Sequence, residues 1–220
     1  MDRDVLQKSK LFGGLNKDNT EYALCFLNAA EKEYSKGEFM HQAGHRLLHF
    51  GLVMSGTVQV CMDDINGNNM IMANATAGET FGESLCFLSM DDIPIYIRAV
   101  TDVRVLWMET SSIFACLQGC DTRKHDLIIR FISMLAERTL AMNDRIQILS
   151  KLCLRDKLVT FFSQYMYKSG SRVFVVPFDR SDMSVYLGTN RSSLSRELSK
   201  MRKEGIIEFH KNHFHLLKKF

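Results

Sequence analysis

The sequence has no uninterrupted apolar run long enough to cross a bilayer, and its start, MDRDVLQKSK, lacks the apolar segment of a secretory signal. Its six cysteines are scattered without a repeated spacing. In a chain with no export signal, such cysteines are expected to be reduced and mostly buried thiols. These absences predict a cytoplasmic protein that uses neither a membrane nor disulfide bonds.

Clusters of metal-binding residues are also scarce. Only Cys25 lies in the first sixty residues, so an iron–sulfur cluster held there is not expected. His41, His45 and His49 recur every four residues, a step of ~13 Å along a strand and too far for one metal ion. No compact His/His/Glu set of a metal-dependent enzyme appears. We therefore predict no metal site and no enzymatic activity. A metal- or haem-dependent sensor and a cupin-type enzyme stay open as alternatives.

The charge of the chain is unevenly distributed. Residues 151–220 carry 14 Lys and Arg against 6 Asp and Glu, a formal charge of +8, whereas residues 1–150 carry 14 against 19, a formal charge of −5. A basic C-terminal third beside an acidic remainder indicates a polyanion-binding module joined to a part that avoids polyanions. Chance clustering of surface lysines is the alternative. At 220 residues, the chain is long enough for two ordinary domains.

Residues 190–203, NRSSLSRELSKMRK, fit one short helix with two different faces. Asn190 is a good N-cap, because its side-chain oxygen can accept from the backbone N–H of Ser192 or Ser193. Three apolar residues at helical spacing form one stripe: Leu194, Leu198 and Met201. The opposite side carries cations and hydroxyls: Arg191, Ser192, Ser195, Arg196, Lys200 and Lys203.

A second short helix is predicted just before this one. Asp179 can cap it, and Gly188 can end it because glycine readily adopts positive φ. Two helices joined by a short glycine-containing turn form a helix-turn-helix, whose second helix enters the DNA major groove. A solvated helical hairpin with a basic face would give the same two helices. Residues 207–209 and 214–216 then fit two short strands, which would complete a winged helix.

The segment SDMSVYLGTNRSSLSRELSKMRKEGII resembles the C-terminal domain of the cyclic-AMP receptor and fumarate–nitrate regulator (CRP/FNR) family of bacterial transcription factors. YSKGEFMHQAG, LVMSGTVQV and AGETFGESLCF resemble the family's effector-sensing β-roll. The resemblance implies an α+β chain with an N-terminal cupin-like β-roll (jelly roll), a long dimerisation helix and a C-terminal winged helix-turn-helix. We expect the roll and a helical lead-in over residues 1–122, the long helix over 123–152 and the winged helix over 153–220.

Strand signals in residues 31–110 support the β-roll independently. Val58, Val60 and Met62 alternate with other residues as in a strand, and residues 65–68, INGN, form a hairpin-turn signal. Residues 70–72, 95–99 and 103–107 suggest further strands. Many short strands separated by turn signals indicate a closed sandwich or barrel.

Residues 123–153 carry a heptad pattern typical of a helix that pairs with another helix. Its apolar seam consists of Ile128, Ile132, Leu135, Thr139, Met142, Ile146 and Leu149, spaced four and three apart in alternation. The chain has no second helix of similar length, so the seam predicts a homodimer. Packing of this helix on its own roll is the alternative. In the family this helix is the dimer axis.

The resemblance assigns the DNA-binding residues. Arg191, Ser192 and Arg196 occupy the positions that contact bases, and arginine can bind the O6 and N7 atoms of guanine. Serine at position 192 departs from the acid that many members have there. Thr189, Ser193, Lys200 and Lys203 are the candidates for phosphate contacts. The expected partners are double-stranded DNA, a second copy of the chain and RNA polymerase. A protein-interaction module that binds an acidic partner is a further alternative.

The resemblance also indicates an effector pocket, with departures from the family. Gly82, Glu83 and Ser84 resemble the start of its phosphate-binding cassette. Ile93 and Pro94 stand where the family's arginine and serine neutralise the phosphate of a cyclic nucleotide. Without a cation, a buried phosphate would carry a large desolvation cost. On the long helix, Met142 and Asn143 replace the threonine and serine that meet the base. We therefore predict a DNA-binding transcriptional regulator controlled by an unknown small effector other than cyclic AMP.

Overall fold

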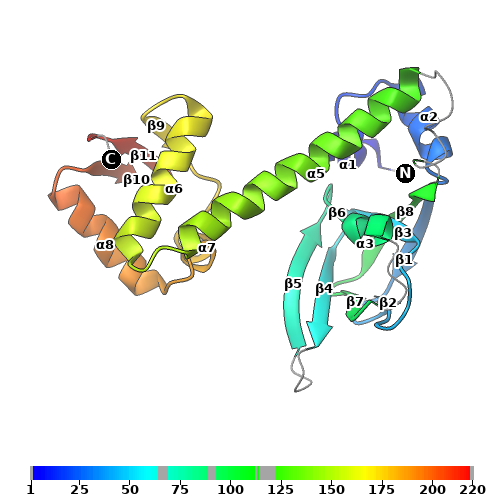
Figure 1. The fold of residues 1–220 in the computed structure, drawn as a ribbon, viewed down its shortest axis with the longest axis horizontal. Coiled ribbons are helices and arrows are strands. Elements are labelled where there is room, and N and C mark those ends of the chain that lie inside the picture. Colours follow the sequence, from blue (N-terminus) through cyan, green and yellow to red (C-terminus); the bar gives the residue numbers. More distant parts are fainter. Residues whose placement is uncertain (1, 64–68, 89–92, 112, 114–121, 219–220) are drawn as a thin grey trace. The chain divides into compact units, whose positions relative to one another are not determined.

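The computed structural model describes residues 2–63, 69–88, 93–111, 113 and 122–218 (Figure 1). Its contacts divide the chain into two compact units, Met1–Met134 and Leu135–Phe220. The first is dominated by β-strands and the second by helices, so the predicted α+β class is confirmed. Among the described residues, no helix combines the length and the apolar character needed to cross a membrane.

The first unit is a roll of two antiparallel sheets preceded by two short helices. The helices are α1 (Arg3–Lys8), α2 (Lys17–Phe26) and, within the roll, α3 (Glu83–Leu88). The strands are β1 (Ala30–Tyr34), β2 (Phe39–His41), β3 (His49–Ser55), β4 (Thr57–Asp63), β5 (Asn69–Thr76), β6 (Thr80–Phe81), β7 (Ile95–Ala99) and β8 (Val103–Glu109). They pair in the orders β1-β8-β3-β6 and β2-β7-β4-β5. The predicted hairpin is thus formed by β4 and β5, while its predicted turn lies outside the described residues.

The long helix α5 (Thr122–Leu149) begins on this roll. Leu127, Phe131 and Met134 form a buried stripe, and the ring of Phe131 lies 5.4 Å from that of Phe50 on β3. Arg130 adds a hydrogen bond from Nη1 to the carbonyl of Gly13, at 2.7 Å. The first turns of α5 are therefore part of the core of the first unit.

The second unit contains the end of α5 and a small winged helix. It comprises α6 (Leu154–Ser169), β9 (Val173–Val175), α7 (Arg180–Tyr186), α8 (Arg191–Lys203), β10 (Ile207–His210) and β11 (His213–Leu216). The three strands form one antiparallel sheet of order β10-β11-β9. The two helices predicted between residues 179 and 203, and the hairpin that follows them, are confirmed.

The core of the second unit combines one aromatic cluster with one apolar face of α8. Leu194, Leu198 and Met201 are fully buried, so the predicted stripe is confirmed. They share a cluster with Phe162 of α6 and Phe214 of β11, whose ring centroids are 4.9 Å apart. Burying an apolar side chain of this size contributes about 1.5–3 kcal/mol. This burial fixes which side of α8 faces solvent.

The last turns of α5 pack within the second unit. Ile148 is fully buried there, and Asp144 receives a hydrogen bond from Gln164 to its carbonyl at 3.0 Å. The Asp144 carboxylate also lies 2.6 Å from Nζ of Lys168. The contacts thus change from one unit to the other inside α5, between Met134 and Leu135, whereas the sequence suggested a boundary between residues 152 and 153. The helix itself stops at Leu149 and α6 starts at Leu154; the domain bounds stay a prediction.

The four cysteines that the structure describes are free thiols. Cys61 and Cys86 are buried, while Cys25 and Cys153 are exposed, so burial holds for only half of them. Burial and the neighbouring Glu83 raise the pKa of Cys86 to about 12, which keeps this thiol protonated and unreactive at neutral pH.

The turn between α7 and α8 depends on Gly188, as predicted. Its φ is +60°, and the N–H of Thr189 bonds to the carbonyl of Ser184 at 3.0 Å across the turn. A Cβ at Gly188 would lie 3.1 Å from Leu149 of α5, whereas Gly170 has φ +64° and open space around it.

Replacing Gly188 with alanine should therefore destabilise the second unit by about 1–3 kcal/mol, from left-handed backbone strain plus a tight contact with Leu149. Gly170→Ala carries the same backbone strain without the contact and is the matched control. Hydrogen exchange of the α7 and α8 amides measures both. Equal loss of protection in the two variants would show that the contact with Leu149 contributes nothing.

Candidate functional site

Asn190 is the N-cap of α8, as the sequence predicts. The Oδ1 atom of Asn190 accepts from the backbone N–H of Ser193 at 2.8 Å and from the hydroxyl of Ser192 at 2.8 Å. The Ser192 hydroxyl is thus oriented by the cap. Arg191, which lies between these residues, is exposed.

The solvent-facing side of α8 carries the residues that the resemblance assigned to DNA. Arg191, Ser192, Arg196, Lys200 and Lys203 are exposed, while Thr189 and Ser193 are half-buried. One shallow groove on the helix is lined by Ser195, Arg196, Ser199, Lys200 and Lys203. Guanidinium, ammonium and hydroxyl groups in one row can donate to phosphate oxygens and to base edges.

Arg180 is a functional candidate that the sequence reasoning missed. Its guanidinium lies over the rings of Phe209 and Phe214, at 4.9 and 5.2 Å from their centroids, and Nη2 donates to the carbonyl of Lys211 at 2.9 Å. Burial lowers the pKa of Arg180, yet an arginine stays charged at neutral pH. Arg180, Arg191 and Lys211 line one pocket beside the turn of the wing. Arg180 of α7 and Lys211 in the turn of the wing therefore add cations to those of α8.

A second missed residue, Arg155 at the start of α6, holds the far side of α8. Its Nη1 donates to Oε1 of Glu204 at 3.2 Å, its Nη2 pairs with Oε2 of the same residue, and Oε1 of Glu197 lies 3.7 Å away. The contact with Arg155 lowers the pKa of Glu204. This fork connects α6 to the middle and the end of α8, so it positions the helix.

The residues expected to bind an effector are distributed over both units. Gly82 has φ +80°, and a Cβ there would lie 2.7 Å from the Leu47 side chain. Glu83 is buried and accepts from the hydroxyl of Thr80 at 3.1 Å. Ile93 is fully buried, and its carbonyl accepts from the N–H of Gly44 at 2.9 Å.

Four further residues of the expected pocket have exposed side chains. They are Ser84, Pro94, Met142 and Asn143. The first two belong to the first unit, whereas Met142 and Asn143 belong to the second. The structure therefore places Gly82 and Ile93 against the loop that follows β2, while the Glu83 carboxylate bonds to Thr80.

The three histidines of residues 41–49 do not gather into a metal site. His41 is buried in β2, His45 lies exposed in the loop, and His49 of β3 pairs with Glu109 at 3.4 Å. In the part of the chain that the structure describes, no three His, Cys, Asp or Glu side chains are arranged to hold a metal ion.

The seam of α5 is exposed over most of its length. Ile132, Met142 and Ile146 are each about 60% exposed, and Leu149 is 41% exposed. Thr139 is also exposed, while Ile128 and Leu135 are half-buried. The stripe that packs in the first unit, formed by Leu127, Phe131 and Met134, is a different one. An apolar seam is therefore left open to solvent along the helix.

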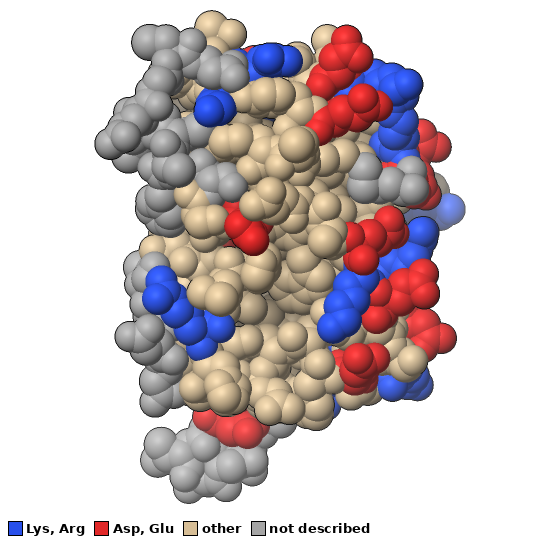
Figure 2. Space-filling view, turned by 90° about the vertical axis from the view of Figure 1, so that its right-hand side faces the viewer, with Lys and Arg blue, Asp and Glu red and all other residues tan. Residues whose placement is uncertain are grey.

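Ionic side chains elsewhere are arranged differently from those of α8. On the face that Figure 2 shows, acidic and basic side chains are interspersed along one margin, and the centre carries few of either. Such a face presents no continuous cationic surface to a polyanion. The row of cations on α8 is therefore the stronger candidate for a nucleic-acid interface.

Comparison with protein families gives two matches that together cover most of the chain. The first is a cyclic nucleotide-binding domain over residues 31–120, and the second is a Crp-like helix-turn-helix domain over residues 128–219. A search of curated proteins found no match.

Solved structures share the fold at low sequence identity. The chain is similar to the catabolite activator protein of Thermus thermophilus, with 22% identity over 94% of this chain and 93% of that one and a TM-score of 0.52. It is also similar to DNR from Pseudomonas aeruginosa, with 16% identity, 99% and 94% coverage and a TM-score of 0.52. OCPA-complexed CprK gives 15% identity, 90% coverage of both chains and a TM-score of 0.60.

Proposed function

We propose that this chain, which belongs to the CRP/FNR family of DNA-binding transcription regulators, acts as a homodimer that reads two DNA half-sites under the control of a small effector other than cyclic AMP. The family consists of regulators and not enzymes, so the chain has no catalytic centre to account for. Its roll is an effector-binding domain of the cyclic nucleotide-binding type, and its winged helix binds DNA.

The exposed cations at the start of α8 carry the proposal for DNA reading. Arg191 and Arg196 lie on the face opposite the buried stripe, and the N-terminal residues of a recognition helix contact base edges. Each arginine can pair with the O6 and N7 atoms of guanine. Lys200 and Lys203, with Thr189 and Ser193, are assigned to phosphates, which position the protein without specifying sequence.

Pairing through α5 explains the open seam. Exposed apolar side chains at heptad spacing are stabilised when a second helix covers them. The buried stripe of Leu127, Phe131 and Met134 already occupies the face toward the roll, which supports an intermolecular partner for the seam. A two-fold dimer would present two copies of α8 to half-sites about one helical turn of DNA apart.

The surroundings of Ile93 support an effector other than cyclic AMP. This fully buried isoleucine stands where the family places an arginine, so a cyclic phosphate would meet an apolar side chain instead of a cation. We assign the switch to an equilibrium between two arrangements of the winged helices of the dimer, and a bound effector shifts this equilibrium.

The regulator would work in the cytoplasm, where DNA and RNA polymerase are available.

Substituting Arg191 and Lys203 separates base reading from phosphate binding. The test duplex is one that the wild-type protein selects from a random pool. The Arg191→Ala variant should bind this duplex about 1–3 kcal/mol more weakly, and it should discriminate less between DNA sequences. The Lys203→Ala variant should bind all duplexes more weakly by a similar factor. The slope of the log binding constant against log salt concentration should be smaller by about 1. Fluorescence anisotropy at several salt concentrations measures both. An Arg191→Ala variant that keeps full affinity and selectivity would contradict the assignment.

Placing a charge in the seam should separate the subunits. Ile132→Asp and Ile146→Asp would each bring two carboxylates into the dimer interface, so sedimentation equilibrium should give a mass close to one chain. Operator affinity should fall with dimerisation. Ser133→Asp, a neighbouring exposed position off the seam, is the matched control. Dimers of unchanged affinity in both isoleucine variants would exclude pairing through α5.

Cyclic AMP should give no saturable heat when it is titrated calorimetrically into the protein, because the buried side chain at position 93 is apolar and cannot neutralise the cyclic phosphate. Operator binding by the same preparation shows that the protein is active. A saturable isotherm in the micromolar range, together with a change in operator affinity, would overturn this part of the proposal.

A further inference from the structure

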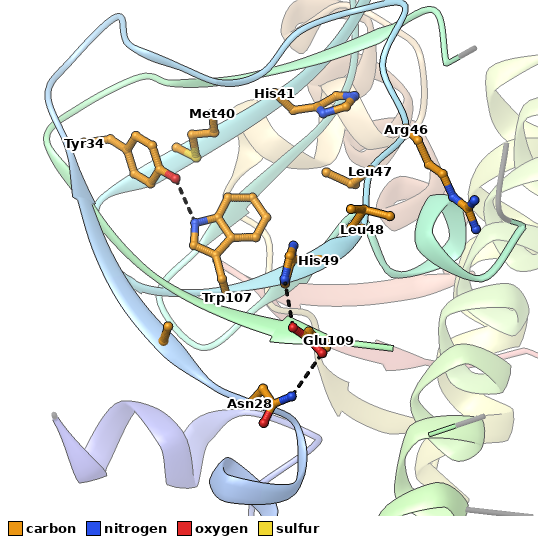
Figure 3. A pocket seen from close by; sticks show the side chains of 11 residues that line it. Asn28, Tyr34, Met40, His41, Arg46, Leu47, Leu48, His49, Trp107 and Glu109 are labelled. Carbon is orange, nitrogen blue, oxygen red and sulfur yellow. Dashed lines mark hydrogen bonds and ion pairs between the residues drawn. The ribbon is translucent and has the colours of Figure 1, made fainter. Parts of the chain in front are cut away.

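The first unit contains a pocket that shares none of the residues expected to hold an effector. It has a volume of about 510 Å³, within the usual range for small-molecule sites. Its walls come from β1, from the loop that joins β2 to β3, and from β8 (Figure 3). None of Gly82, Glu83, Ser84, Ile93 or Pro94 lines it.

One end of this pocket is aromatic and apolar. The Trp107 ring points into the space between Tyr34 and Leu47, and Met40 lies beside it (Figure 3). The indole Nε1 donates to the hydroxyl of Tyr34 at 2.9 Å, and the ring meets Phe81 edge-to-face at 5.3 Å. These two contacts fix the orientation of the indole, so a flat aromatic ligand would meet a preorganised surface.

The other end of the pocket offers a carboxylate. Oε2 of Glu109 accepts from Asn28 at 3.0 Å and from Ser111 at 3.0 Å, while Oε1 faces His49 at 3.4 Å. These hydrogen bonds lower the pKa of Glu109, so the group is ionised at neutral pH. The 3.4 Å separation is longer than a good N–H···O bond, which leaves Oε1 able to accept a shorter one.

A buried imidazole lies in the wall of the same pocket. His41 is 9% exposed, and its Nε2 atom has no hydrogen-bond partner. Burial lowers the pKa of His41, while a hydrogen bond to the backbone of His45 acts in the opposite direction. The wall therefore also contains a buried ring nitrogen that has no hydrogen-bond partner among the described residues.

The charges around the pocket disfavour an ion of either sign. Arg46 lines it together with Glu109, so an anion would be attracted by one and repelled by the other, and the same holds for a cation. A neutral ligand avoids both repulsions. The lining therefore favours an uncharged aromatic ligand that has a hydrogen-bond donor.

We propose that this pocket binds a small neutral phenol, whose ring lies against Trp107 and whose hydroxyl donates to the carboxylate of Glu109. A hydrogen bond from a hydroxyl to a carboxylate is charge-assisted and about twice as strong as a neutral one. Met40 and the exposed Leu48 add apolar surface to the lining of the pocket. We assign only ligand binding to this site. The assignment does not depend on whether a bound phenol changes the affinity for operator DNA.

The experiment uses the full chain and its single tryptophan, which is Trp107 itself. Four matched probes are titrated while the indole emission is recorded: 4-methylphenol, 4-methylanisole, 4-methylbenzoate and 4-methylbenzylamine. We expect a saturable change with 4-methylphenol and at least about tenfold weaker binding of the anisole, which lacks the donor. A linear, unsaturable response to the phenol overturns the proposal. Equal affinity for the anisole, or tighter binding of either charged probe, also overturns it.

Two variants localise the binding. Glu109→Gln keeps the size of the side chain and removes its charge, so affinity for 4-methylphenol should fall about tenfold. Glu33→Gln, an exposed position on β1 outside the pocket, should leave the affinity unchanged. Unchanged affinity in Glu109→Gln overturns the assignment. If that variant fails to fold, the comparison of the four probes on the wild-type chain still decides.

Discussion

Burial of one apolar stripe of α8 is the constraint on which the rest of the DNA-binding unit depends. Leu194, Leu198 and Met201 are fully buried in a core that includes the rings of Phe162 and Phe214. When one face of a helix is buried in a core, the residues on its opposite face are necessarily exposed to solvent. Every exposed cation of α8 therefore follows from this packing, and a change in the core would turn the reading face away from the groove that it is expected to enter.

The long helix α5 contributes side chains to both units. Its start belongs to the core of the sensing unit through Phe131, and its end to the DNA-binding unit through Ile148 and Asp144. The apolar seam between these two ends is exposed, and it is the surface that we propose a second subunit covers.

Much of the candidate interface was predictable because its signals are local. The Asn190 cap, the turn at Gly188 and the buried stripe each depend on residues within one or two helical turns, so their spacing in the sequence is sufficient. Arg180 and Arg155 were missed for the opposite reason. Arg155 meets Glu204 from 49 positions away, and no periodicity links two residues at that separation.

The sequence alone determined the type and order of the elements, the polarity of α8 and the lack of a cation at Ile93, because propensity, capping and periodicity act over a few residues. Only the tertiary structure decided that Trp107 would be fixed by Tyr34, 73 positions away, beside an ionised Glu109. A pocket is formed by strands that become neighbours through sheet pairing. The chemistry of the pocket depends on side chains that lie far apart in the sequence and that these strands bring together. Local sequence patterns therefore cannot predict it.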